Sequence, residues 1–311
     1  MRPENGFQHL ALNAAKLLVM STKPVASPYL VPFDGSFRVK DAKTQPPKSG
    51  RDKDGNKKSL KKSIKKLTEL QRRLYADDRH ALLLVFQAMD AAGKDGTIRA
   101  VMSGVDPAGC QVFSFKAPSA EERDHDFMWR VYRSLPERGR IGIFNRSHYE
   151  EVLVVRVHPE FLEGQQLPRP LDPKAIWKSR YEAIRAFEKH WAASGTVVLK
   201  FWLNVSEQEQ GKRFLDRIDE PEANWKFSAR DVEERKLWDK YMVAYEKALN
   251  ETSRPEAPWY AVPADDKAFM RATVADIIVR KLEQLDLRYP EVTAEERAAL
   301  LARRAELTPE E

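Results

Sequence analysis

The sequence predicts an α/β fold in which helices cover both faces of a mostly parallel β-sheet. Two observations predict this fold class: short apolar runs bounded by turn residues recur along the chain, and longer segments of helical periodicity separate them. A chain of 311 residues can bury a stable core of this kind without disulfides. The apolar runs predicted to form strands are Ala81–Gln87, Gln111–Phe115, Ile141–Phe144, Thr196–Leu203 and Pro258–Val262.

The segment before the first strand has a different composition. Residues 38–58 are rich in Lys, Asp, Gly and Pro and lack an apolar period, so residues 1–57 are predicted to form an N-terminal arm and linker. A basic amphipathic helix follows, because apolar residues then recur at helical spacing among lysines and arginines. This helix either packs on the core or faces a polyanion. Its apolar positions are Leu60, Ile64, Leu67, Leu70 and Leu74.

A helical insertion interrupts the alternation after the fourth strand. Residues 206–252 contain two helical patterns and no strand, and Ser206 with Glu209 has the spacing of a capping box. This segment is predicted to form a helical lid at one edge of the sheet. The core is thereby divided into residues 58–205 and 253–290, and residues 291–311 are predicted to form a C-terminal helix and tail.

Composition and charge exclude some classes of protein. The single cysteine, Cys110, excludes an internal disulfide framework and indicates a reducing compartment, so we predict a cytoplasmic protein. Residues 10–20 are apolar but contain Lys16 and lack a cleavage site, and no apolar run reaches the roughly 20 residues that cross a bilayer. The formal net charge of +6 suits nucleic acid, nucleotide or polyphosphate, and equally an ordinary soluble surface.

The segment from Leu82 to Ile98 carries the most informative pattern in the chain. An apolar strand runs into a turn of small residues, then Gly93-Lys94, then a helix, which is the context of a phosphate-binding loop. Ala88 stands where the generic loop has its first glycine, and an ordinary strand–turn–helix corner is the alternative. Backbone N–H groups and the Lys94 ammonium would surround phosphate oxygens. The predicted phosphate-binding residues are Ala91, Ala92, Gly93, Lys94, Asp95, Gly96 and Thr97.

Two carboxylates accompany this loop. Asp90 would hold Mg²⁺ or orient the attacking oxygen, because metal ions and cations carry most of the catalysis of phosphoryl transfer. Alternatively, Asp90 bonds its own backbone within the turn. Asp95 stands where the generic loop has Ser or Thr. Asp95 would either bind the metal, as proposed for Asp90, or be a first-turn carboxylate favoured by the helix dipole.

A second group of polar residues follows the third strand: Asn145-Arg146-Ser147-His148-Tyr149-Glu150. Residues just past the C-terminal end of a parallel strand face the ligand crevice, so Arg146 would lie near the phosphates if this strand neighbours the first. Arginine offers bidentate contacts to phosphate oxygens, and a solvated turn arginine is the alternative. We assign His148 an orienting or packing role, because such a loop permits direct in-line transfer without a phosphohistidine.

The chain resembles the family-2 polyphosphate kinases in two motifs, Ala88-Met89-Asp90-Ala91-Ala92-Gly93-Lys94-Asp95-Gly96 and Phe144-Asn145-Arg146-Ser147-His148-Tyr149-Glu150. The resemblance covers about residues 58–285 and implies a three-layer α/β/α P-loop kinase core with a helical lid. It also implies Mg²⁺ dependence, with Mn²⁺ as a substitute, and a homodimer or homotetramer. Further landmarks in the same order are Ala117-Pro118-Ser119, Asp219-Glu220-Pro221, Asn224-Trp225-Lys226-Phe227-Ser228, Ala257-Pro258-Trp259-Tyr260 and Ala264-Asp265-Asp266-Lys267.

The resemblance further implies reversible phosphoryl transfer between inorganic polyphosphate and nucleoside mono- and diphosphates of adenine or guanine. By matching positions, the resemblance implies that Lys94 binds the phosphates, that Asp90 binds the metal or acts as a base, and that Arg146 binds the transferring phosphoryl group. Arg217 would join them in catalysis and Asp231 would support the metal, although a solvated helix face is the alternative for the lid charges. The cations expected to bind the phosphate chain are Lys94, Arg146, Arg213, Arg217, Lys226 and Arg230.

Two positions depart from many members of that family. Asn145 stands where they have Asp, and metal binding is weaker there because an amide is a poorer ligand than a carboxylate. Glu150 stands where they have Asn, and this form of the motif resembles the class III members, which phosphorylate both AMP and ADP. Both residues are expected at the nucleotide. Glu150 would tune the choice of acceptor by binding a metal, a base or a sugar hydroxyl.

Two rival functions stay open at this point. An ATP-dependent nucleoside monophosphate kinase would share the core, but its loop normally has Gly at the Ala88 position and Ser or Thr after the lysine. A nucleic-acid-binding module would use the basic helix at 60–74, yet no recognised motif of that class is present. We therefore expect no nucleic-acid or membrane partner. The polyphosphate groove is expected to be lined by the lid, Lys116 and Arg123.

Overall fold

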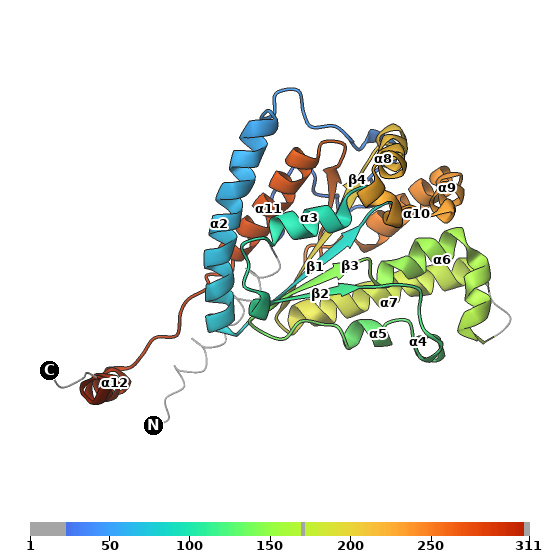
Figure 1. The fold of residues 1–311 in the computed structure, drawn as a ribbon. Coiled ribbons are helices and arrows are strands. Elements are labelled where there is room, and N and C mark those ends of the chain that lie inside the picture. Colours follow the sequence, from blue (N-terminus) through green and yellow to red (C-terminus); the bar gives the residue numbers. More distant parts are fainter. Residues whose placement is uncertain (1–22, 169–171, 308–311) are drawn as a thin grey trace.

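The sheet of this computed structural model contains five strands that all pair in parallel, in the order β2-β3-β1-β4-β5 (Figure 1). The predicted strands are confirmed, and their ends differ from prediction by at most one residue. The structure describes residues 23–168 and 172–307; the apolar segment at 10–20 and the end of the predicted tail lie outside them. The strands are β1 (Ala81–Gln87), β2 (Cys110–Ser114), β3 (Ile141–Asn145), β4 (Thr196–Asn204) and β5 (Trp259–Pro263).

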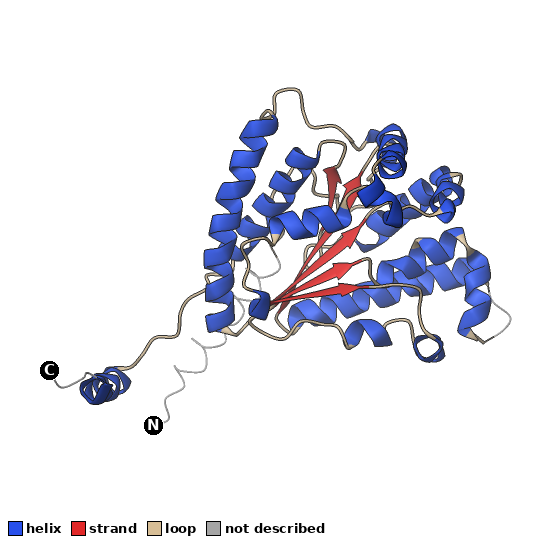
Figure 2. Ribbon diagram, viewed as in Figure 1, coloured by secondary structure: helices blue, strands red, loops and turns tan. Residues whose placement is uncertain are grey.

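Helices cover both faces of the sheet, so the predicted three-layer arrangement is confirmed (Figure 2). One face carries α3 (Lys94–Val101) and α11 (Lys267–Glu283), and α2 (Lys53–Asp77) packs along α11. The other face carries α7 (Pro173–Ala193) and α10 (Trp238–Thr252), which contact each other. The unbroken apolar composition of the strands follows from this burial on both faces.

The remaining helices are mostly short connections, except for α12, which lies apart from the body of the molecule in Figure 1. No helix in the described ranges combines the length and the apolar character needed to cross a membrane. These helices are η1 (Val39–Asp41), η2 (Pro107–Gly109), α4 (Ala120–Asp124), α5 (Trp129–Tyr132), η3 (His148–Val152), α6 (Val154–Val157), η4 (Pro159–Gln165), α8 (Glu207–Asp219), η5 (Pro221–Lys226), α9 (Ala229–Arg235) and α12 (Ala294–Leu307).

The segment 206–252 is more divided than its sequence suggested. It forms α8, η5, α9 and α10, where two helical patterns had been expected. The ring of Tyr245 in α10 stacks on Trp202 of β4, with ring centroids 5.3 Å apart. Helix α10 therefore belongs to the layer that covers this face of the sheet. Only α8, η5 and α9 have the exposed, charged character expected of a lid.

The N-terminal arm, predicted to be extended and peripheral, packs on the core in its described part. Val25 and Val31 are buried, and Leu30 pairs with Tyr260 in an antiparallel bridge at the free edge of β5. Covering an edge strand in this way removes a site for unwanted strand pairing. The apolar stretch at 25–33 is short, is interrupted by prolines and has no helical or strand period, so this packing was not predicted.

Helix α2 begins earlier than predicted and packs on the core. Asp52 caps it by accepting a hydrogen bond from the Gly55 N–H, so the helix starts at Lys53 rather than after residue 57. Leu67 and Leu74 are fully buried. The core-packing alternative for this basic helix is therefore the correct one for its apolar face.

Candidate active site

The loop between β1 and α3 has the strand–turn–helix form predicted from its sequence. Gly93 lies immediately before α3 with φ of 101°, a left-handed conformation that favours glycine. Ala91 is also left-handed, with φ of 61°, which costs a non-glycine residue roughly 1–2 kcal/mol. The Thr97 hydroxyl donates to the Gly93 carbonyl at 2.9 Å and fixes the first turn of α3. The loop is thus held in a defined and partly strained shape.

Lys94 begins α3 with its side chain folded into the loop. Its ammonium donates a hydrogen bond to the Ala88 carbonyl at 2.9 Å, and the residue is only 9% exposed. Burial, followed by the charge of Arg146, lowers the pKa of Lys94, and the Asp90 carboxylate partly opposes this shift. A phosphate oxygen can replace the Ala88 carbonyl as the acceptor for this ammonium.

Asp90 and Arg146 come from neighbouring strand ends and form an ion pair. Phe86 and Asn145, at the ends of β1 and β3, are register partners, and the Arg146 guanidinium reaches the Asp90 carboxylate at 2.9 Å. Burial alone would raise the pKa of Asp90, but the charges of Lys94 and Arg146 outweigh it and hold the pKa below its ordinary value. The predicted approach of Arg146 to the loop is therefore observed.

The backbone of Arg146 is strained as well. Its φ of 61° is left-handed, and its N–H donates to the Phe86 carbonyl at 3.1 Å. Strained non-glycine residues of this kind persist where the surrounding structure over-determines them, and they concentrate at functional sites. The strain supports a functional role for this arginine.

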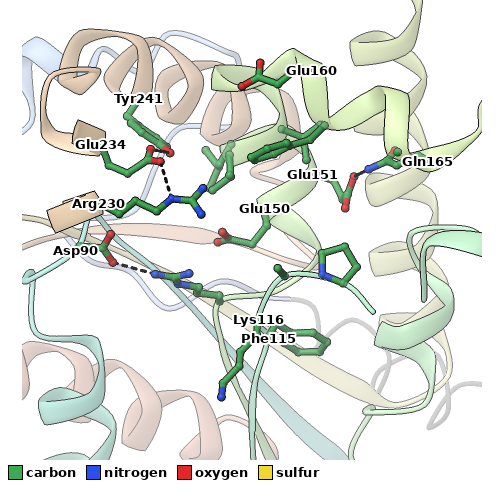
Figure 3. Close-up of a pocket in the computed structure, with 18 of the residues that line it drawn as sticks. Asp90, Phe115, Lys116, Glu150, Glu151, Glu160, Gln165, Arg230, Glu234 and Tyr241 are labelled. Carbon is green, nitrogen blue, oxygen red and sulfur yellow. Dashed lines mark hydrogen bonds and ion pairs between the residues drawn. The ribbon is translucent and has the colours of Figure 1, made fainter. Parts of the chain in front are cut away.

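Asn145 and Glu150 lie close in sequence but face different neighbours. The Asn145 amide donates to the Asp95 carboxylate, which ties the end of β3 to the start of α3. Glu150 lines the pocket and projects into it (Figure 3). Burial raises the pKa of Glu150 against the opposing charges of Arg146 and Lys94. Glu150 therefore offers a carboxyl group to a ligand at a place already surrounded by cations.

A pocket of about 810 Å³ opens beside these residues, within the size range of sites for small molecules. It extends from the ends of β1 and β3 to the segment after β2 and to α9 and α10. Figure 3 shows Phe115 and Lys116 on one side of it and Arg230, Glu234 and Tyr241 on another. Among the residues that the structure describes, its wall carries six carboxylates, Asp90, Glu150 and Asp231 among them, together with five cations that can neutralise an anionic ligand. The cations are Lys116, Arg123, Arg130, Arg146 and Arg230.

The other predicted lid cations differ in their placement. Arg230 lines the pocket, and the Arg217 guanidinium lies 3.7 Å from the carboxylate of Asp231, which also lines it. Lys226 instead turns towards Trp225, with its ammonium 5.0 Å from the ring centroid. Arg217 and Arg230 are therefore near the pocket, and Lys226 is engaged by its neighbour.

Arg213, predicted to bind the phosphate chain, has its donors engaged within the protein. The residue is 4% exposed, and its Nε donates to a carboxylate one helical turn earlier. The remaining N–H groups are engaged by backbone carbonyls, so no donor is left for phosphate. These carbonyls belong to Ala91 at 3.1 Å, Ala92 at 2.9 Å, Ala264 at 2.7 Å and Asp265 at 2.9 Å.

Asp90 and Asp231 are the candidate ligands for Mg²⁺, and both line the pocket. Burial first, and the charge of Asp90 second, raise the pKa of Asp231, so the two carboxylates repel each other across the pocket. A divalent cation would relieve that repulsion, and Mg²⁺ commonly takes only one or two protein carboxylates together with phosphate and water. In the described ranges no group of three or more His, Cys, Asp and Glu could enclose a metal. The residues present fit a Mg²⁺ ion shared with the substrate.

Several residues around the pocket were missed by sequence inspection. Arg180 of α7 donates to the Glu151 carboxylate at 2.9 Å and fixes this wall residue from outside. Glu234 accepts a hydrogen bond from Tyr241 at 2.6 Å and contacts the His158 ring at 2.9 Å. Most of these partners are distant in the sequence, so no local pattern could have revealed them.

A Gly-Lys loop after one strand, an arginine after its neighbour and a pocket lined by charged residues at the carboxyl ends of a parallel sheet define a P-loop phosphotransferase. Within that class, residues 50–290 match the family described as Polyphosphate kinase 2 (PPK2). The chain belongs to this family, which confirms the resemblance seen in its two motifs.

Individual relatives agree with the family. An ADP-polyphosphate phosphotransferase from Rhodopseudomonas palustris is 58% identical over 249 residues, covering 80% of this chain and 86% of the relative. An AMP/ADP-polyphosphate phosphotransferase from Meiothermus ruber is 43% identical over 266 residues, covering 85% and 95%. The crystal structure of Polyphosphate Kinase 2 from Arthrobacter aurescens superposes with a TM-score of 0.78 at 36% identity, covering 89% of this chain and 100% of that one.

Proposed function

We propose that this chain transfers a phosphoryl group between inorganic polyphosphate and adenine nucleotides, converting AMP to ADP and ADP to ATP. The observation that carries the proposal is the ion pair of Asp90 with Arg146 at one end of a nucleotide-sized pocket, next to Ala88, whose carbonyl accepts a hydrogen bond from Lys94. The names of the two relatives support the acceptors, since one includes ADP and the other both AMP and ADP.

The residues at this end of the pocket suit direct in-line transfer. In the transition state, charge spreads over the equatorial oxygens of the transferring group, and Lys94 and Arg146 stabilise it. Arg217 adds positive charge from α8, as its effect in lowering the pKa of Asp90 indicates. Mg²⁺, which Mn²⁺ can replace, would be held by Asp90 and Asp231 and would neutralise charge on the donor and acceptor phosphates.

The rest of the pocket would hold the two substrates. Lys116, Arg123 and Arg230 would neutralise phosphates. Glu150 would contact the nucleotide and bias the choice between AMP and ADP. We further propose a cytoplasmic homodimer or homotetramer. The single cysteine, Cys110, supports the reducing compartment.

The test supplies ADP, Mg²⁺ and polyphosphate without ATP and measures ATP formation. Lys94→Ala should lower kcat by about 10²–10³-fold, because it removes a fixed charge from the transition state. Lys62→Ala on the exposed surface of α2 is the control and should keep full activity. ATP-dependent phosphorylation of AMP without any polyphosphate-dependent activity would favour an ordinary nucleoside monophosphate kinase. A fully active Lys94→Ala enzyme would refute the catalytic assignment.

A further inference from the structure

A second hollow, of about 370 Å³, lies where α6, α7 and α10 meet. It shares α6 with the catalytic pocket: Val154 and Val155 line that pocket, whereas Arg156 lines the second hollow. We call this hollow the α7 groove, because most of its lining residues come from α7. None of the phosphate-binding motifs contributes to it, so the proposed reaction leaves it without a role.

The α7 groove is rich in positive charge, with five cationic side chains against the carboxylates of Glu182 and Glu251. One cation pairs with Glu251 at 3.3 Å and another approaches Glu182 at 4.0 Å. In the part of the chain that the structure describes, no carboxylate lies within ion-pair distance of the other three. The two paired cations are Arg185 and Lys178, and the other three are Arg156, Lys174 and Lys247.

Aromatic side chains hold part of this charge in place. Arg156 donates to the Tyr181 hydroxyl at 3.2 Å, and its guanidinium lies 5.5 Å from the centroid of the Trp177 ring. Arg180 approaches the same ring at 5.6 Å. Because two guanidinium groups engage Trp177, the ring is occupied by cation–π contacts rather than free to stack on a nucleobase. The groove therefore suits a chain of phosphates that carries no bases better than it suits nucleic acid.

We propose that the α7 groove is a second binding site for the polyphosphate chain, outside the catalytic pocket. The proposal rests on the proposed function, which makes a long polyanion the substrate. Such a chain carries negative charge along its whole length and extends beyond the catalytic pocket. A second cationic site next to the pocket raises the effective concentration of the chain at the first site without contacting the reacting atoms.

Charge reversal of three exposed groove lysines tests this site. The variant combines Lys174→Glu, Lys178→Glu and Lys247→Glu. In ADP phosphorylation, its KM for long-chain polyphosphate should rise about tenfold with kcat unchanged, because one of two linked sites is lost. Its KM for a chain of only a few phosphates should not change. The matched control makes the same charge change at exposed positions of α2, and should alter neither KM: Lys61→Glu, Lys62→Glu and Lys65→Glu.

Several outcomes would overturn the proposal. Equal rises in KM for both triple variants would show that net charge matters and the groove does not. Equal rises for long and short chains would place the effect in the catalytic pocket. RNA that displaces long-chain polyphosphate from the wild type but not from the groove variant would assign the groove to nucleic acid. If the wild type forms no ATP from polyphosphate, the proposed function fails, and calorimetric titration of long-chain polyphosphate into both proteins still decides whether the groove binds it.

Discussion

Arg213 donates hydrogen bonds to the carbonyl oxygens of Ala91 and Ala92, at 3.1 and 2.9 Å, and thereby joins α8 to the phosphate loop. The same guanidinium bonds two carbonyls that follow β5, so one side chain ties three segments together. Since Ala91 has a left-handed backbone, the loop depends on such contacts to keep its shape. We therefore treat Arg213 as a positioning residue for the loop.

Arg213→Lys keeps the charge but removes the planar fork of donors, and tests this role. We expect kcat to fall by about 10²-fold, because a small displacement of the loop misplaces Lys94. Unsatisfied buried carbonyls should also destabilise the fold by about 2–3 kcal/mol. Steady-state kinetics and urea unfolding measure the two effects. Lys212→Ala, at the exposed neighbouring position, should change neither. A variant with normal kcat but a raised KM for polyphosphate would restore Arg213 as a ligand of the chain.

Asp90→Asn should weaken the response to Mg²⁺ more than it weakens folding. The amide oxygen can still accept from Arg146, so the geometry is kept while the negative charge is lost. The Mg²⁺ concentration giving half-maximal rate should rise by about 10–100-fold, and titration of activity with Mg²⁺ and Mn²⁺ measures it. Asp239→Asn, at an exposed position of α10 that does not line the pocket, is the matched control. The same metal requirement in wild type and Asp90→Asn would remove Asp90 from the metal site.

Glu150→Gln should change acceptor selectivity in a pH-dependent way. Burial raises the pKa of Glu150 above its ordinary value of 4.5, so below the raised pKa the wild-type side chain is protonated and resembles glutamine. The ratio of kcat/KM for AMP and ADP should therefore be similar in the two proteins at the acid end. It should diverge as the pH rises and Glu150 ionises beside Arg146. Parallel pH profiles that never separate would mean that this carboxyl group does not reach the acceptor.

The catalytic end of the molecule was predictable because its signals are local. The turn ending in Gly93-Lys94 and the motif around Arg146 are each continuous in the sequence. Parallel strands bring their carboxyl ends to one edge, so the two motifs were expected to meet if their strands were neighbours, and β1 and β3 do pair. The strands themselves stand out because burial on both faces leaves unbroken apolar runs.

Where the role of a residue depends on partners distant in the sequence, that role was either not predicted or predicted differently. In the sequence, Arg213 is one of several charged residues on an amphipathic helix. Its burial depends on the segment after β5, whose carbonyls accept hydrogen bonds from its guanidinium. Val25 and Val31 lie in a short stretch that is apolar but interrupted by prolines, so no periodic pattern predicted their burial. In the sequence, Lys200 is a charged residue within an otherwise apolar strand. The pattern of the strand does not show its partner, Glu188, which lies on the preceding helix.

Lys200 and Glu188 form an ion pair buried between β4 and α7, with side chains 0% and 2% exposed. Tyr149 donates to the Glu188 carboxylate at 2.8 Å and accepts from the Lys200 ammonium at 2.8 Å. Because Tyr149 belongs to the motif that carries Arg146 and Glu150, this pair anchors the catalytic turn from behind. A change at Glu188 should therefore affect both stability and the pocket.

Glu188→Gln is expected to destabilise the protein by about 3–5 kcal/mol, because the Lys200 charge would be left buried without a counter-charge. Burial alone would raise the pKa of Glu188, but the contacts with Lys200 and His148 together outweigh it and hold the pKa below its ordinary value of 4.5. A carboxyl group with a lowered folded pKa stabilises the fold above its unfolded pKa, and that contribution is lost as the pH falls. The wild-type free energy of unfolding should thus decline more steeply than that of Glu188→Gln as the pH drops below about 4.5. Urea unfolding at a series of pH values, with the exposed Glu182→Gln as control, measures this difference, and equal declines in wild type and Glu188→Gln would contradict it.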